Sequence, residues 1–167
     1  MIKKNNIIKG YILMNNNYLN VYNNLIRLTR NKNLYHNTNA DTFYDRMIVF
    51  FFHLSFLLKE YKQIETKTNM QQFFDFCIRQ IELSIREIGY GDATINKKMK
   101  DYINLLYSII DKIHKWENQD NNKKIEILKI YIPDLVNHEN YLDYFEKYRK
   151  FLSKNSFNNL SKDIIEF

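Results

Sequence analysis

The chain has only three glycines and one proline in 167 residues, and two of the glycines, Gly89 and Gly91, lie two positions apart. Apolar residues recur at helical spacing both before and after this point. Because glycine adopts the left-handed backbone conformation without steric cost, we expect a helix to stop at Gly89. Asp92 or Thr94 can cap the helix that follows. The pattern predicts a tight Gly-x-Gly-Asp helical corner with charged residues on either side.

The scarcity of helix breakers and the 45% of hydrophobic residues predict an all-α fold, a single-domain bundle of about six helices. Helical periodicity places these helices at residues 18–30, 42–62, 69–88, 95–116, 123–132 and 138–153. The second helix is apolar nearly all round over residues 47–58, so we expect it at the centre of the bundle.

Cap-forming residues precede several of these helices. Asp41 is expected to cap the second helix, and Asn137 the sixth. Thr68 with Gln71, three residues later, has the spacing of a capping box at the start of the third helix.

The chain divides into three parts on composition. Residues 1–17 are expected to be a disordered leader, or an extension upstream of a true start at Met14. Residues 18–153 form the helical domain, and residues 154–167 a polar, loosely held C-terminal tail. The longest apolar run, residues 47–58, is shorter than the roughly 20 residues that span a bilayer. We therefore expect a soluble chain that is at most peripheral to a membrane.

The cysteine, histidine and serine residues show no pattern typical of an enzyme active site. Cys77 is the only cysteine, which excludes an internal disulfide, and it falls on an apolar helix face as a buried thiol would. His53 is expected to be a hydrogen-bonded core histidine, since no histidine here has metal-ligand spacing. Neither a glycine-flanked serine nor a glycine-rich phosphate loop is present. We predict a non-enzymatic protein without cofactors.

At the corner, the sequence resembles the ubiquinol–cytochrome c chaperone family. The similarity rests on Ile-Arg-Glu-Ile-Gly-Tyr-Gly-Asp at residues 85–92, on the lysines at residues 97–100, and on Tyr107 in a Leu-Leu-Tyr-Ser run. Upstream, Asp41, Arg46 and His53 match an aspartate, an arginine and a histidine of the family. The resemblance covers residues 18–116 well and 123–152 weakly. The family's acidic pair is reduced to Glu82, and two of its glycines are replaced here, by residues 96 and 108.

This resemblance implies an assembly factor for respiratory complex III that binds newly made cytochrome b. It also implies a small partner protein and work near the ribosome. We expect the bacterial cytoplasm, peripheral to the inner membrane, or the mitochondrial matrix side in a eukaryote.

The candidate interaction residues lie at the corner, on the helix after it and on the second helix. They are Arg86, Glu87, Gly89, Gly91, Asp92, Lys97, Lys98, Lys100, Tyr107, Arg46 and His53. The charges at residues 86, 87, 92 and 97 could form a salt-bridged network that fixes the corner, or a recognition patch. The lysines could be a solvated face, or could meet anionic lipid or ribosomal RNA.

Two alternatives remain open. The net charge of +6 and a turn followed by a basic helix start resemble a nucleic-acid-binding helix-turn-helix. Against it, lysine suits phosphate contact better than base reading, so no specific nucleic acid is expected. A helical bundle that binds a small molecule is the second alternative.

Overall fold

The computed structural model describes residues 2–35, 41–62, 64–133, 138–162, 164–165 and 167, with side chains described from residue 16 onwards apart from residue 33. These ranges contain α-helices (α) and short 3-10 helices (η), in the order α1 Ile2–Thr29, η1 Lys32–Leu34, α2 Phe43–Tyr61, α3 Lys67–Glu87, α4 Asp92–His114, η2 Trp116–Asn118, α5 Asn121–Tyr131, α6 His138–Lys154 and α7 Phe157–Leu160. The described chain contains no strand, which confirms the predicted all-α bundle.

Helix α2 is the centre of the bundle, as its composition predicted. It contacts α1, α4 and α6, and its residues 47–57 are all buried. Phe52 and Phe56 stack against Phe145 of α6, with ring centroids 5.3 and 5.5 Å apart. Burial of each such ring stabilises the fold by about 1.5–3 kcal/mol, so the aromatic run of α2 holds the other helices together.

The cap residues of α2 and α3 differ from the prediction. Thr42, rather than Asp41, caps α2: its hydroxyl accepts from the Asp45 N–H at 3.3 Å, and the Asp45 carboxylate accepts from the Thr42 N–H at 2.9 Å. Thr66, rather than Thr68, caps α3. In each case the cap lies close to the predicted residue along the chain, because several residues there carry a suitable side-chain oxygen. Residue 137, the predicted cap of α6, lies outside the described residues.

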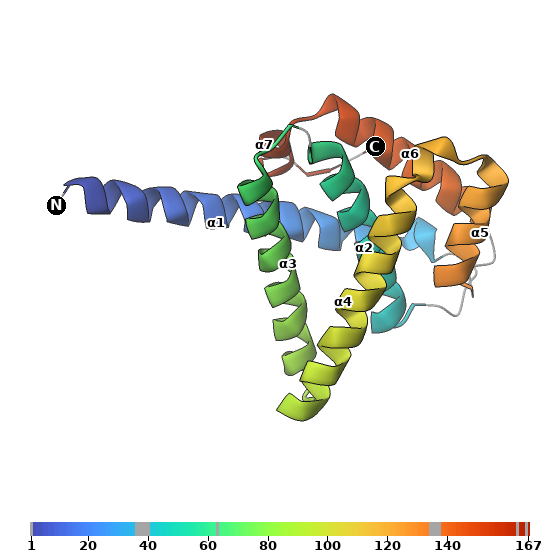
Figure 1. Ribbon diagram of the computed structural model, residues 1–167, viewed down its shortest axis with the longest axis horizontal. Helices are drawn as coiled ribbons and strands as arrows, with labels where there is room; N and C mark the ends of the chain where they lie inside the picture. Colours follow the sequence, from blue (N-terminus) through green and yellow to red (C-terminus); the bar gives the residue numbers. More distant parts are fainter. Residues whose placement is uncertain (1, 36–40, 63, 134–137, 163, 166) are drawn as a thin grey trace.

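The first helix begins at Ile2, well before the start expected at Tyr18. Figure 1 shows its first half extending beyond the other helices. From Tyr18 on, its buried side chains pack against α2 and α3. The division of the chain into leader, domain and tail stays a prediction.

The segment after α6 is packed onto the bundle, so the expectation of a loosely held tail is wrong for its described residues. Phe157 of α7 is buried against Tyr18, Tyr61 and Phe73. The Asn24 side chain of α1 donates to the carbonyl oxygen of Leu160 at 2.8 Å. Composition alone labelled this segment polar, whereas its few apolar residues fill the junction of α1, α2 and α3.

A partly buried ionic cluster joins η2, α5 and α6. The Glu146 carboxylate accepts from Lys124 Nζ at 2.7 Å and from Trp116 Nε1 at 2.9 Å, and Arg149 donates to its other oxygen. Burial alone would raise the pKa of the Glu146 carboxyl, but these three donors outweigh it and lower that pKa.

No helix in the described ranges has the length and apolarity needed to cross a membrane.

Candidate protein-interaction site

The corner between α3 and α4 has the backbone that the sequence predicted. Gly89 takes φ +97°, in the left-handed region, and its N–H donates to the Arg86 carbonyl at 2.9 Å. Gly91, not Asp92 or Thr94, occupies the cap position of α4, and no side chain caps that helix. Asp92 is instead the first residue of α4, where its negative charge interacts favourably with the positive end of the helix dipole. Figure 1 shows α3 and α4 meeting at this corner and diverging from it.

Arg86 ties the two sides of the corner together. Its guanidinium donates to Asp92 at 2.5 Å across the turn and to Glu82, one turn back on α3, at 2.8 Å. Both carboxylates, Asp92 first, raise the pKa of Arg86. In the described chain Glu87 and Lys97 form no ion pair, so of the two alternatives a salt-bridged network holds only for Arg86 and Asp92, joined by Glu82. These pairs are exposed and contribute little to stability, so the left-handed backbone of Gly89 shapes the corner more than the charges do.

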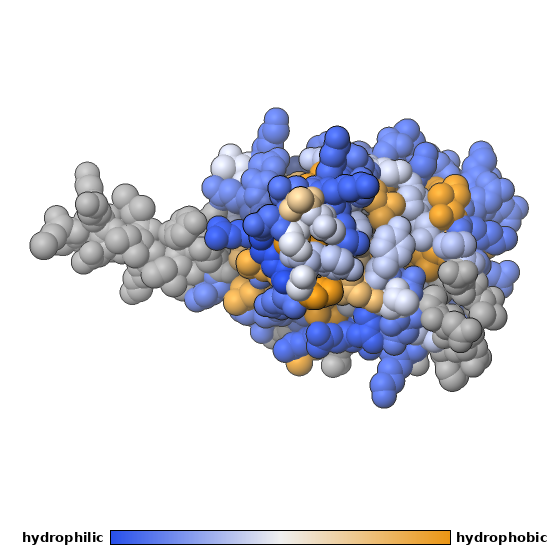
Figure 2. Space-filling view, turned by 90° about the horizontal axis from the view of Figure 1, so that it is seen from below, coloured by the Kyte–Doolittle hydropathy of each residue, from blue (hydrophilic) through white to orange (hydrophobic). Residues whose placement is uncertain are grey.

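The corner and the first turns of α4 present exposed apolar side chains and cations close together. Lys98 Nζ lies over the ring of Tyr90, 4.6 Å from its centroid. Lys97 and Lys100 are exposed, with no ion pair within the described part of the structure. Ile88 is 51% exposed and Tyr90 42%. Figure 2, which views the molecule from the corner end, shows apolar surface breaking a largely hydrophilic face.

An apolar groove runs between α3 and α4, and we call it the α3–α4 groove. It consists of two adjoining hollows of about 630 and 410 Å³ that share Phe74 and Tyr107. These two rings stack across the groove, with centroids 5.9 Å apart and planes at 26°. The other apolar lining residues are Leu58, Met70, Ile78, Leu83, Ile103 and Ile110. Tyr107 is 55% exposed and Leu83 44%, so apolar area here faces solvent.

The two ends of the groove carry different charges. The end toward the corner is lined by Asp75 and Glu82 together with Arg79. The opposite end is lined by Lys62, Lys67 and His114 and by no carboxylate. The difference in charge between the two ends, together with the apolar lining, suits a bound amphipathic helix whose own ends differ in charge.

Two predicted site residues lie on α2 and away from the groove. Arg46 makes a bidentate pair with Asp41, at 2.6 and 2.9 Å, which lowers the pKa of that carboxyl. His53 is fully buried, as a core histidine should be. Its Nδ1 lies 2.7 Å from the Val49 carbonyl, so Nδ1 must be the donor, and Nε2 accepts from the Tyr144 hydroxyl at 2.8 Å. Neither residue forms part of the α3–α4 groove.

Sequence reasoning missed most of the groove. It identified Tyr107 only through the resemblance and did not pair it with Phe74, which is 33 positions earlier in the chain. The half-buried residues Phe74, Ile78 and Ile103 have the same helical spacing as core residues. Their partial exposure depends on the divergence of α3 and α4, which no local pattern encodes. Within the described residues, no cluster of three or more histidine, cysteine or acidic side chains could hold a metal ion.

The structure is a helical bundle with an apolar groove whose two ends differ in charge. A family model described as ubiquinol-cytochrome C chaperone matches residues 36–123, more than half of the 167 residues. The chain therefore belongs to the ubiquinol-cytochrome C chaperone family. No curated protein and no solved structure matches it significantly. Membership in a chaperone family implies a non-enzymatic role.

Proposed function

We propose that this protein is an assembly factor for respiratory complex III that binds newly made cytochrome b until it joins the complex. The family match supports this role, because the matched stretch contains α2, α3 and α4. That stretch therefore includes both walls of the groove and the whole corner. The observation that carries the proposal is that the matched residues contain the whole α3–α4 groove.

The α3–α4 groove supplies the contact for an apolar client. A membrane subunit that has not yet been assembled exposes apolar helical segments that must be kept from water and from one another. A helix can lie along the groove with its apolar face on Phe74 and Tyr107. The two hollows remain open to solvent rather than closing over a guest, which suits a complex that must release its client.

The corner serves as an orienting rim at one end of this groove. Arg86, Asp92 and Glu82 present fixed charges there, held by their mutual hydrogen bonds. Charges of this kind steer encounter and set orientation more than they add affinity. We propose that Glu87, which no ion pair in the described chain engages, is available to a cationic group of the client.

The lysines in the first turns of α4, of which Lys97 and Lys100 are exposed and Lys98 is half-buried, suit an anionic surface near the site of synthesis. We propose that Lys97, Lys98 and Lys100 face anionic lipid, where each cation contributes about 1 kcal/mol. Peripheral placement at the inner membrane, a small partner protein and nearness to the ribosome belong to the same proposal.

Affinity capture tests the proposal. The tagged chain is crosslinked in a host that makes complex III, purified from membranes and analysed by mass spectrometry. We expect enrichment of cytochrome b that a Glu87→Lys, Asp92→Lys double variant loses. A Lys123→Glu, Lys129→Glu variant on exposed positions of α5 is the matched control and should retain the client. Enrichment of nucleic-acid-binding proteins without cytochrome b would contradict the proposal and favour the helix-turn-helix alternative.

A further inference from the structure

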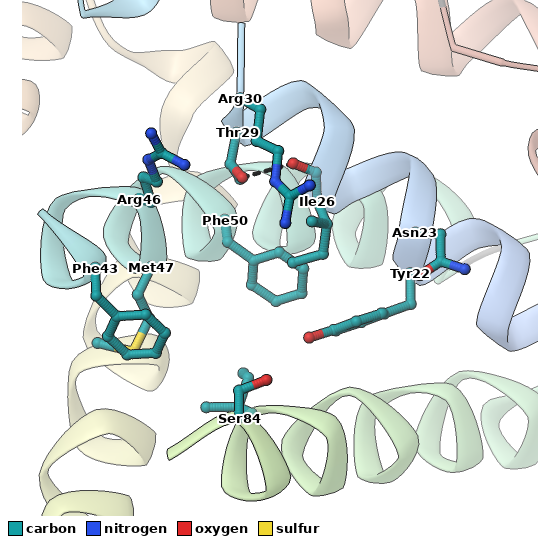
Figure 3. Close-up of a pocket in the computed structure, with 11 residues that line it drawn as sticks. Tyr22, Asn23, Ile26, Thr29, Arg30, Phe43, Arg46, Met47, Phe50 and Ser84 are labelled. Carbon is teal, nitrogen blue, oxygen red and sulfur yellow. Dashed lines mark hydrogen bonds between the residues drawn. The ribbon is translucent and has the colours of Figure 1, made fainter. Parts of the chain in front are cut away.

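A second hollow, separate from the α3–α4 groove, lies between α1, α2 and α3. Its volume is about 340 Å³. Figure 3 shows Phe50 above it, Met47 and Phe43 on one side, and Tyr22 on the other. Ile26 and Ile81 complete the apolar lining. We call this hollow the α1–α2–α3 pocket.

The pocket is amphipathic, since Tyr22, Asn23, Thr29, Ser84 and two arginines line it together with the apolar side chains. Thr29 donates its hydroxyl to the Ile26 carbonyl at 2.7 Å, and Ser84 donates to the Gln80 carbonyl at 3.0 Å, so both hydroxyl protons are already used. The Tyr22 hydroxyl points into the space in front of Ser84 (Figure 3). The apolar part of this lining can take up a hydrocarbon group, and the polar part can orient a charged or hydrogen-bonding end of the same ligand.

Two arginines, Arg30 and Arg46, line the same pocket, and they differ in whether a carboxylate pairs with the guanidinium. Arg46 is held by Asp41 through two hydrogen bonds, so its charge is matched. Arg30 follows the last residue of α1, and in the described chain no carboxylate lies within ion-pair distance of it. Figure 3 shows its guanidinium turned toward the pocket beside Ile26.

Arg30 is not needed to finish its own helix. The last carbonyls of α1 are satisfied by the Thr29 hydroxyl and by the backbone N–H groups of Arg30 and Asn31. Among the described residues no hydrogen bond or ion pair engages the Arg30 guanidinium, and a carboxylate or phosphate matches that planar fork bidentately.

We propose that the α1–α2–α3 pocket binds a small amphipathic anion, with its hydrocarbon part against Phe43, Met47 and Phe50 and its anionic group on Arg30. A water molecule occupies about 30 Å³ in the liquid, and a methylene group is of similar size. The pocket volume of about 340 Å³ therefore holds roughly ten such groups. That size fits a medium-length hydrocarbon chain with one carboxylate or phosphate. The pocket shares no lining residue with the α3–α4 groove, so this site is independent of the proposed client contact.

Calorimetric titration of the full chain with decanoate tests the proposal, with 1-decanol as the uncharged analogue. We expect saturable decanoate binding, weakened about tenfold or more by Arg30→Gln, because a charge-assisted hydrogen bond is lost. Ser84→Leu, which fills the pocket, should abolish binding. Arg27→Gln on the same helix is the matched control, since Arg27 is exposed and does not line the pocket, and it should leave binding unchanged.

Decyl phosphate serves as a second probe and distinguishes the source of the anion. Tighter binding than decanoate indicates a phosphate-bearing lipid, and weaker binding a free fatty acid. Equal affinity for decanoate and decanol, or binding that Arg30→Gln and Ser84→Leu leave unchanged, would overturn the proposal. So would the absence of binding in a chain whose unfolding transition shows that it is folded. Chemical-shift changes of the Met47 methyl group on titration report the site directly.

Discussion

Acidification should destabilise the protein through His53. Burial lowers the pKa of this fully enclosed imidazole from 6.5 to about 4. Its neutral form is also the one its partners require, since Nε2 accepts from Tyr144. Below pH 6.5 the unfolded chain binds a proton at this residue and the folded chain does not. Stability is therefore fully present above pH 6.5 and is lost as the pH falls from 6.5 to about 4.

The magnitude follows from the two pKa values. Each pH unit within that window costs about 1.4 kcal/mol, so lowering the pH from about 7.5 to about 5.5 should remove about 1.4 kcal/mol of unfolding free energy. Urea unfolding at both pH values measures it. His53→Phe serves as the comparison, because it keeps an aromatic ring in the core but cannot titrate. The reasoning is refuted if the two proteins lose the same free energy between these pH values.

Four further substitutions, each measured by urea unfolding, test the fold. Gly89→Ala should lower the unfolding free energy by about 1–2 kcal/mol, because alanine is strained at the left-handed φ of +97° found there. Gly91→Ala is the control: with φ −72° and open space around the new methyl group it should cost far less, and an equal loss in the two variants would contradict the reasoning. Glu146→Ala should cost about 3 kcal/mol, because it leaves Lys124 Nζ buried without its carboxylate; a loss below about 1 kcal/mol in urea unfolding would contradict this. Phe157→Ala should cost about 3–5 kcal/mol, as for other buried rings, and a neutral result would show that α7 does not contribute to the core.

The elements with strong local signals could be predicted from the sequence. The apolar run of α2 placed that helix at the centre because no face of it could remain in water. Gly89 marked the corner because few residues other than glycine adopt its backbone conformation. The assignment of His53 to a hydrogen-bonded core position followed from its apolar neighbours, and the structure confirms it.

Features set by contacts distant in sequence could not be predicted. The burial of Phe157 depends on α1, α2 and α3 meeting at one point, which its polar neighbours do not indicate. The partnership of Phe74 with Tyr107 depends on the angle at which α3 and α4 diverge. The caps were misplaced because neighbouring side chains, such as Asp41 and Thr42, are equally able to accept from a helix N-terminus.

The central claim is that the α3–α4 groove holds newly made cytochrome b. A photo-crosslinking amino acid at Tyr107, inside the groove and 55% exposed, tests it most directly during synthesis of cytochrome b. The same amino acid at Ile130, which is 67% exposed on α5 and outside the groove, is the control. The account predicts a crosslink to cytochrome b from position 107 and none from position 130. A crosslink from position 130 alone, or none to cytochrome b from either position, would contradict it.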